Sequence, residues 1–300
     1  MTGRADVRVL VIGATGMLGH KVWQVFRDKF ETWAAVRGGS AVERMTLFAD
    51  GRVIKDVTVE NFDSVVRACS TAAPTVIVNC AGIVKQRTLG TDPLSSIAVN
   101  ALYPHRAALL ARASGARLIH ISTDCVFAGT RGAYSERDVP DATDLYGRTK
   151  LLGEVAGPGL LTLRTSVIGR ELAGTQGLTE WFLAQRGGRV TGFARAFFSG
   201  LTTRAFATVL ADVIDGHPTL EGVYHVASAP ISKYDLLRKL NDAYGAGVEI
   251  EPSEGLQIDR TLDGSGFVHA TGVRVPHWDQ MIDDMVSDPT PYEQWRRPCV

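Results

Sequence analysis

Apolar positions at the start of the chain follow two different periods. Residues 7–12 form a short β-branched run that ends at a glycine, which is typical of a buried parallel strand. Over residues 17–29 the apolar side chains recur at helical spacing, and an extended pattern resumes over residues 32–36. The pattern therefore predicts a strand-helix-strand unit.

The same alternation continues through the first half of the chain. It predicts helices at 61–72 and 97–114, strands at 75–79, 117–122 and 160–165, and a helix that carries Tyr146 and Lys150. Strands that alternate with helices predict an α/β fold, a Rossmann-type doubly wound parallel sheet. The later pattern is less regular, with helices expected at 179–186, 202–215, 232–244 and 278–287. We expect a dinucleotide-binding domain over 1–168 and a smaller α/β substrate lobe over 169–300, with the chain free to cross back between them.

Charge and cysteine content exclude several classes of function. Lys plus Arg and Asp plus Glu both total 32, so no overall basic field favours binding of nucleic acid. The cysteines are scattered without a CxxC pair, which predicts neither a disulfide framework nor a metal site and fits a reducing compartment. The first apolar run is too short for a signal segment or a membrane span. We expect a cytoplasmic protein with no membrane partner.

A glycine-rich turn follows the first predicted strand and leads into a helix. In a dinucleotide site, glycines at this spacing allow the tight turn, the approach of a pyrophosphate to backbone N–H groups, and close packing of helix on strand. An ordinary strand-to-helix turn is the alternative. The residues expected to contact the cofactor here are Gly13, Thr15, Gly16, Met17, Leu18 and Gly19.

The end of the second predicted strand indicates which cofactor is preferred. An acidic residue there would bind the ribose hydroxyls of NAD, but the strand ends at Arg37. A guanidinium suits a 2'-phosphate, and Ser40 could donate a second hydrogen bond, so the sequence favours NADPH over NADH. A solvated surface arginine is the alternative. Other strand ends where the cofactor is expected carry Asp56, Val57, Cys80, Ala81 and Gly82.

Tyr146 and Lys150 are four residues apart and therefore share one face of the predicted helix. Reduction of a ketone needs a proton, and the Lys150 charge, with that of an oxidised nicotinamide, would lower the phenol pKa enough for Tyr146 to supply it. Thr123, at the end of the preceding strand, would hydrogen-bond the carbonyl oxygen. Asn100 is expected either to hold a water that relays protons to Lys150 or to brace a helix.

With these residues, the chain resembles an extended short-chain dehydrogenase, and most closely the dTDP-4-dehydrorhamnose reductase branch. The motifs that match are at 13–19, 79–82, 122–127, 146–150 and 163–165, with less specific matches at 199–203, 222–226, 231–236 and 259–263. The resemblance implies transfer of a hydride from NAD(P)H to the 4-keto carbon of a nucleotide-linked 6-deoxyhexulose. It implies a catalytic triad of Thr123, Tyr146 and Lys150, places Thr165 near the cofactor, and is compatible with a homodimer.

Two positions depart from related patterns. Cys125 stands where sugar-nucleotide dehydratases have a glutamate, which argues for simple reduction rather than dehydration. Ser166 and Val167 follow the strand-six Arg-Thr, where the rhamnose branch usually has an aromatic residue. The residues expected to bind the substrate, with Arg260 on its diphosphate, are Lys85, Gln86, Thr123, Asp124, Ser166 and Arg260.

Two other functions fit the same residues. A sugar-nucleotide epimerase would keep NAD bound and return the hydride to its substrate. A regulatory subunit of the same fold would need no catalysis, and the β subunit of methionine adenosyltransferase resembles this branch. The complete set of Thr123, Tyr146 and Lys150 favours an oxidoreductase.

Overall fold

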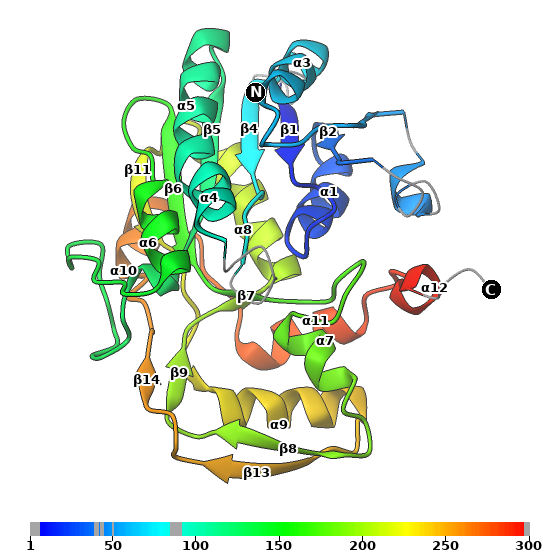
Figure 1. Cartoon of the computed structure of the whole chain (residues 1–300), viewed down its shortest axis with the longest axis vertical. Helices are drawn as coiled ribbons and strands as arrows, with labels where there is room; N and C mark the ends of the chain where they lie inside the picture. The colour runs from blue at the N-terminus through cyan, green and yellow to red at the C-terminus, as the bar shows by residue number, and fades with distance from the viewer. Residues whose placement is uncertain (1–6, 39–41, 43–44, 50, 85–91, 297–300) are drawn as a thin grey trace.

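The computed structural model describes residues 7–38, 42, 45–49, 51–84 and 92–296. Its centre is a seven-stranded sheet in the order β11-β6-β5-β4-β1-β2-β3, with every neighbouring pair parallel (Figure 1). The strands are β1 (Arg8–Ile12), β2 (Glu31–Ala35), β3 (Val53–Ile54), β4 (Val76–Asn79), β5 (Arg117–Thr123), β6 (Leu160–Thr165) and β11 (Gly222–His225). The predicted doubly wound fold is confirmed.

Helices cover both faces of this sheet, which explains why β4 and β6 are buried along their whole length. They are α1 (Gly19–Arg27), α3 (Phe62–Ala72), α4 (Pro93–Ser96), α5 (Tyr103–Ser114), α6 (Leu145–Leu152) and α8 (Thr203–Gly216). The π-helix η4 (Ile97–Leu102) joins α4 to α5, and the 3-10 turns are η2 (Thr46–Phe48) and η5 (Asp124–Val126). Alternate residues of β1 belong to two separate cores, with Val9 in one and Leu10 in the other.

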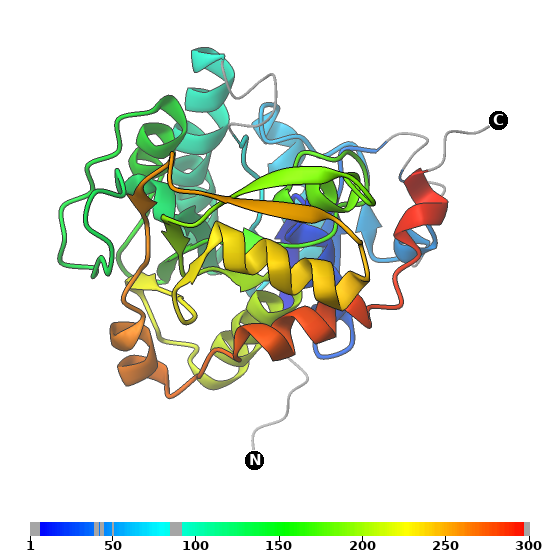
Figure 2. The same ribbon diagram turned by 90° about the horizontal axis from the view of Figure 1, so that it is seen from below.

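Most of the remaining elements lie beyond the carboxyl ends of the large sheet's strands (Figures 1 and 2). Three small sheets pair β7 (Val167–Ile168) with β10 (Leu201–Thr202), β8 (Arg189–Phe193) with β13 (Glu249–Ser253), and β12 (Ile231–Ser232) with β9 (Ala196–Phe198) and β14 (Ile258–Asp259). The helices of this part are α7 (Leu178–Leu183), α9 (Lys233–Tyr244), α10 (Ser265–Thr271), α11 (Trp278–Val286) and α12 (Tyr292–Arg296).

The chain crosses back to the large sheet after residue 200. Helix α8 packs against α1, and β11 extends the sheet by pairing with β6. A division at residue 168 stays a prediction, because residues of both parts build the same core. None of the described helices is long and apolar enough to cross a bilayer.

The end of the chain is attached to α1 by buried polar contacts. The His20 ring lies 2.9 Å from the Tyr292 hydroxyl, and Lys21 forms an ion pair with Asp288. Burial lowers the pKa of His20 to about 3, so this imidazole is neutral at ordinary pH. The contacts connect residues 288–292 to the helix that follows the glycine-rich turn.

Candidate active site

The glycine-rich turn requires its glycines for steric reasons. Gly13 has φ +79°, in the left-handed region, and a Cβ there would lie 2.9 Å from the Ala81 nitrogen. A Cβ at Gly19 would lie 2.0 Å from the carbonyl oxygen of Gly13. The first glycine therefore allows β1 and β4 to meet at the turn, and the last allows α1 to begin directly against it.

Strand ends surround a cavity beside this turn. Its lining combines the glycine-rich turn with the ends of β2 and β4 and one residue of η4: Ile12, Gly13, Thr15, Gly16, Ala35, Arg37, Val57, Val59, Cys80, Ala81, Gly82 and Val99. Small and apolar residues here leave room for a flat ring and a pyrophosphate, and the carboxyl edge of a parallel sheet is where such folds bind ligands. The lining fits a dinucleotide.

Half of the predicted cofactor residues lie in this lining, and the other half do not. Met17 lies near Gly177, Leu18 is buried ahead of α1, and Asp56 is an exposed residue with φ +60°. Ser40, Lys85 and Gln86 lie outside the described residues.

Arg37 lies at the rim of the cavity with an exposed guanidinium. Its Nη2 is 3.5 Å from Oε1 of Glu60, and both side chains are about half exposed. An exposed pair of this kind is weak, so the guanidinium can turn to a phosphate at small cost. Its place is compatible with a 2'-phosphate, and that role stays a prediction.

Tyr146 and Lys150 are placed by the start of α6 and its packing on η5. Asp144 caps the helix by accepting a hydrogen bond from the Gly147 nitrogen at 2.8 Å. A Cβ at Gly147 would lie 2.2 Å from the Cys125 carbonyl oxygen, so this glycine allows α6 to touch the turn that follows Thr123. The helix thereby brings Tyr146 beside the end of β5.

Lys150 is buried beneath the carboxyl end of the sheet. Its Nζ donates a hydrogen bond to the Ile121 carbonyl oxygen at 2.7 Å. Burial lowers the pKa of Lys150 to about 8, and the Glu154 charge opposes that shift. The amine is therefore easier to deprotonate than that of an exposed lysine.

The effect of Lys150 on the Tyr146 pKa stays a prediction, because it was expected together with the charge of a bound oxidised nicotinamide. Burial raises the pKa of Tyr146, and the charges of Cys125 and Asp124 act in the same direction. A hydrogen bond with the Thr123 hydroxyl opposes the shift, which places the two hydroxyls together. In this structure the Lys150 Nζ is hydrogen-bonded to the Ile121 carbonyl oxygen of β5.

Asn100 makes structural hydrogen bonds in η4. Its Oδ1 accepts from the Ile83 nitrogen at 2.9 Å, and its Nδ2 donates to the Ile83 carbonyl oxygen at 2.9 Å. Nδ2 is also 3.4 Å from the Thr149 hydroxyl. Both ends of the amide hold the segment after β4, and Nδ2 also reaches α6, which supports the bracing role of the two expected.

Behind Lys150 lies a buried ionic network. Glu154 accepts hydrogen bonds from the Ser122 hydroxyl at 2.6 Å and from Nε and Nη2 of Arg164 at 2.8 and 2.7 Å. Arg164 Nη1 is 3.3 Å from the His225 ring, which joins β11 to the network. Three strands and the end of α6 thus share one set of hydrogen bonds.

Beyond Thr123, charges from distant parts of the chain meet. The Thr123 hydroxyl donates to Asp124 Oδ1 at 3.1 Å, and Asp124 is buried. Burial raises the Asp124 pKa, and the positive charges of Lys233 and Arg260 oppose this. Lys233 was missed by sequence reasoning, although it lies in one of the motifs that carry the resemblance. Ser166 and Thr165 lie nearby in sequence at the end of β6, where Thr165 is buried.

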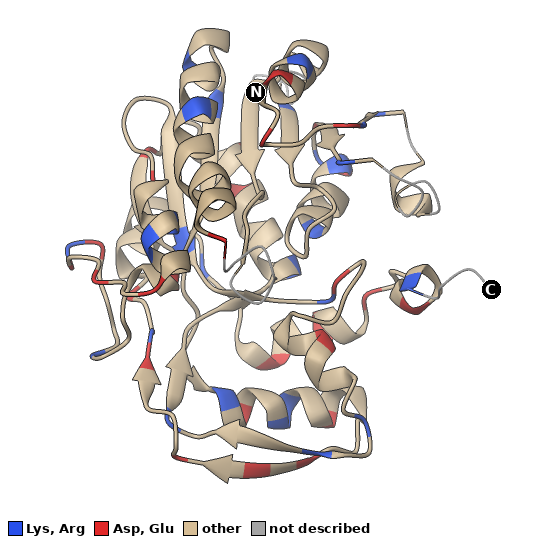
Figure 3. Cartoon of the chain, in the orientation of Figure 1, with Lys and Arg blue, Asp and Glu red and all other residues tan. Residues whose placement is uncertain are grey.

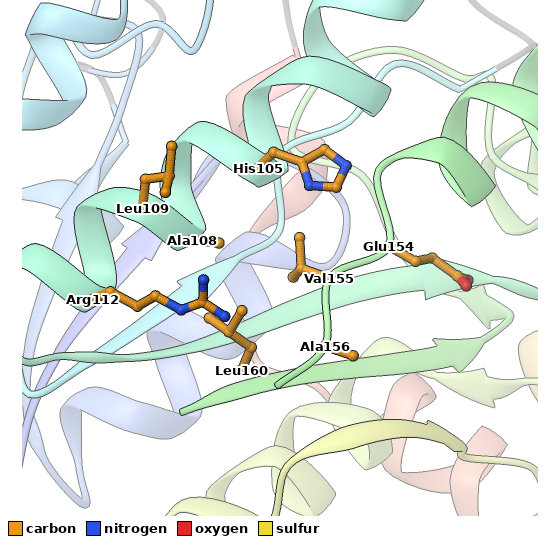
Figure 4. Close-up of a pocket in the computed structure, with 8 residues that line it drawn as sticks. All are labelled: His105, Ala108, Leu109, Arg112, Glu154, Val155, Ala156 and Leu160. Atoms are coloured by element: carbon orange, nitrogen blue, oxygen red, sulfur yellow. The ribbon is translucent and has the colours of Figure 1, made fainter. Parts of the chain in front are cut away.

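A second hollow, of about 450 Å³, lies between α5 and the segment that joins α6 to β6 (Figure 4). His105 and Arg112 line it from α5, and Val155 and Leu160 line it from the other side. Tyr146 and Thr123 are not part of its lining. Its Glu154 carboxylate is already held by Ser122 and Arg164, so we assign it no chemistry.

The glycine turn, the cavity at the strand ends and the Tyr146–Lys150 helix define a Rossmann-fold protein of the extended short-chain dehydrogenase class. The chain matches the family described as RmlD substrate binding domain over residues 7–290 and belongs to it. The resemblance to the dTDP-4-dehydrorhamnose reductase branch is therefore confirmed.

Two relatives differ in the function that their names give. The chain is 31% identical over 262 residues to a dTDP-4-dehydrorhamnose reductase of Mycolicibacterium smegmatis, covering 82% of this chain and 73% of that protein. It is 36% identical over 149 residues to methionine adenosyltransferase 2 subunit beta of Rattus norvegicus, covering 50% of this chain. That match spans 42% of the rat subunit's length.

Solved structures share the fold at low identity. A dTDP-4-dehydrorhamnose reductase from Bacillus anthracis in complex with NADP has a TM-score of 0.75 at 19% identity, covering 93% of this chain and 98% of that one. The Bordetella bronchiseptica enzyme WbmG in complex with NAD and UDP has a TM-score of 0.75 at 20% identity, covering 93% and 94%. These likenesses establish the architecture.

Proposed function

We propose that the protein reduces the keto group of a nucleotide-linked sugar, of the 4-keto-6-deoxyhexulose type, with NADPH preferred over NADH. The observation that carries the proposal is that Thr123, Tyr146 and Lys150 lie together at the carboxyl edge of the sheet that also lines the dinucleotide cavity. The family and the named reductases support the same reaction.

Each residue of the triad has a separate task. When bound, the reduced nicotinamide supplies a hydride to the carbonyl carbon. Tyr146 donates its phenolic proton to the carbonyl oxygen, and Thr123 turns from Asp124 to hydrogen-bond the same oxygen. Lys150 binds the cofactor ribose and, as a cation, stabilises the tyrosinate that remains. The exposed Arg37 would pair with the 2'-phosphate.

The methionine adenosyltransferase relatives favour a second candidate, a regulatory subunit that acts on a partner enzyme. A fold shared by reductases, epimerases and a subunit cannot distinguish these functions. The complete set of Thr123, Tyr146 and Lys150 supports the reductase. A homodimer and a cytoplasmic location stay predictions.

The test supplies NADPH and nucleotide-linked 4-keto-6-deoxyhexuloses to the protein and measures the loss of absorbance of the reduced nicotinamide. We expect stoichiometric oxidation of NADPH by the wild type and loss of at least about 100-fold in kcat for Tyr146→Phe, since general acid catalysis contributes 10²–10⁴. Tyr224→Phe, which removes a hydroxyl from β11, is the matched control and should keep full activity. Conversion of the sugar without net oxidation of NADPH would indicate an epimerase, and tight NADPH binding without turnover would favour the regulatory subunit.

A further inference from the structure

The three-stranded sheet of β12, β9 and β14 places Lys233 and Arg260 on either side of its central strand, β9. Phe197 of β9 pairs with Ser232 of β12 and with Asp259 of β14. Lys233 and Arg260 each come directly after one of these paired positions. Two cations that are 27 positions apart in sequence are therefore held together by strand pairing.

Arg260 is fixed against the turn that follows the catalytic threonine. Its Nε donates to the Phe127 carbonyl oxygen at 2.9 Å, and its backbone nitrogen donates to Phe197 at 3.1 Å. A Cβ at Gly129 would lie 2.9 Å from the Arg260 Cγ, so a glycine is needed for this approach. The small sheet is thus docked onto the segment that carries Thr123 and Asp124.

Lys233 is close to Asp124 and yet not paired with it. Its Nζ lies 3.5 Å from the centroid of the Phe198 ring, and the part of the chain that the structure describes shows no ion pair between Lys233 and Asp124. The two charges nevertheless act on each other, together with Arg260 and Cys125. Burial lowers the pKa of Lys233 to about 8 and raises that of Asp124, as expected for groups that have lost water without gaining a full partner.

We propose that Lys233 and Asp124 determine substrate specificity by binding one sugar hydroxyl between them. The Lys233 ammonium would donate a hydrogen bond to the hydroxyl oxygen, and the Asp124 carboxylate would accept a hydrogen bond from the hydroxyl. A hydroxyl is a small group that both accepts and donates hydrogen bonds. It can therefore bond at once to an ammonium and to a carboxylate that are near each other but form no ion pair. Asp124 accepts a hydrogen bond from Thr123, the residue that the proposed function places on the carbonyl oxygen, so we assign the hydroxyl to the carbon next to the reacting carbonyl. This inference rests on the proposed function.

The test measures binding, so it does not depend on turnover. The whole protein, saturated with NADPH, is titrated calorimetrically with dTDP, dTDP-rhamnose and the dTDP-rhamnose analogue that lacks the hydroxyl at C3. Hydrogen bonds to charged groups predict that the wild type binds dTDP-rhamnose roughly 10- to 100-fold more tightly than the analogue. In Lys233→Met, which keeps the length and packing of the side chain, this ratio should fall below about 3, while the affinity for dTDP stays the same.

Controls separate this inference from the proposed function. Lys239→Met removes an exposed lysine of the same helix, one paired with Asp279, and should keep the wild-type ratio. Asp124→Asn should lower the ratio, and adding it to Lys233→Met should lower it no further. An unchanged ratio in Lys233→Met, with dTDP-rhamnose still bound, overturns the inference alone. A wild type that binds neither dTDP nor dTDP-rhamnose overturns the inference together with the dTDP-sugar form of the proposed function.

Discussion

Replacement of Glu154 by glutamine tests whether the ionic network behind Lys150 holds the fold together. The glutamine side chain keeps the shape of glutamate but puts an amide nitrogen where Ser122 or Arg164 now donates. It also leaves the Arg164 guanidinium buried without a counter-charge. Breaking a buried ion pair from one side costs about 3–5 kcal/mol. We expect a loss of about 3 kcal/mol in the free energy of unfolding, because the Ser122 hydroxyl can rotate to accept from the new amide.

An exposed ion pair of the same chemistry provides the control. Arg189 lies 2.9 Å from Glu249, with side chains 62% and 61% exposed, whereas the Arg164 and Glu154 side chains are 7% and 8% exposed. Because water screens the exposed pair, Glu249→Gln should cost less than about 1 kcal/mol.

Urea unfolding followed by circular dichroism measures both variants. With a dependence of about 3 kcal/mol per molar urea, the Glu154→Gln midpoint should fall by about 1 M and that of Glu249→Gln by less than about 0.3 M. Equal shifts of the urea midpoint in the two variants would refute the reasoning. Burial would then have no effect on how much an ion pair contributes to the free energy of unfolding.

Two further predictions concern the turn and the lysine. Gly19→Ala should abolish tight NADPH binding, measured by fluorescence titration, because its Cβ would lie 2.0 Å from the Gly13 carbonyl oxygen. Gly216→Ala, where a Cβ meets nothing within 4 Å, should bind NADPH as the wild type does. Equal NADPH affinities of the Gly19→Ala and Gly216→Ala variants would contradict this prediction. Burial holds the pKa of Lys150 at about 8 against an ordinary 10.5, so the unfolded chain binds more protons between these values and the free energy of unfolding should rise with pH across that window. In Lys150→Met this rise should be smaller by a few kcal/mol. Urea unfolding at pH 8 and pH 10 measures the rise, and an equal rise in wild type and variant would count against the prediction.

The large sheet could be predicted because buried strands such as β1 can be recognised from their own apolar residues. The apolar run at 7–12 and the expected strand at 160–165 correspond to β1 and β6, since a strand covered on both faces is rich in apolar residues. The short strand β3 was missed because its two residues, Val53 and Ile54, are too few for a period to be visible.

Parts of the site depend on contacts that local patterns do not encode. The place of Lys233 follows from the pairing of β12 with β9, strands of two and three residues. The raised pKa of Tyr146 follows from how deeply α6 packs on η5, which depends on Gly147. The roles of Thr123, Tyr146 and Lys150 stay predictions until turnover is measured.

The return of β11 to the large sheet has a consequence for how the protein can be made. Strand β6 pairs with β5 on one side and with β11 on the other, and β11 begins at residue 222. During synthesis, β6 therefore keeps an open edge until residues 222–225 have left the ribosome. Open edges of apolar strands recruit other chains, so a fragment ending near residue 168 should aggregate. The large sheet can therefore be completed only after β11 has been translated.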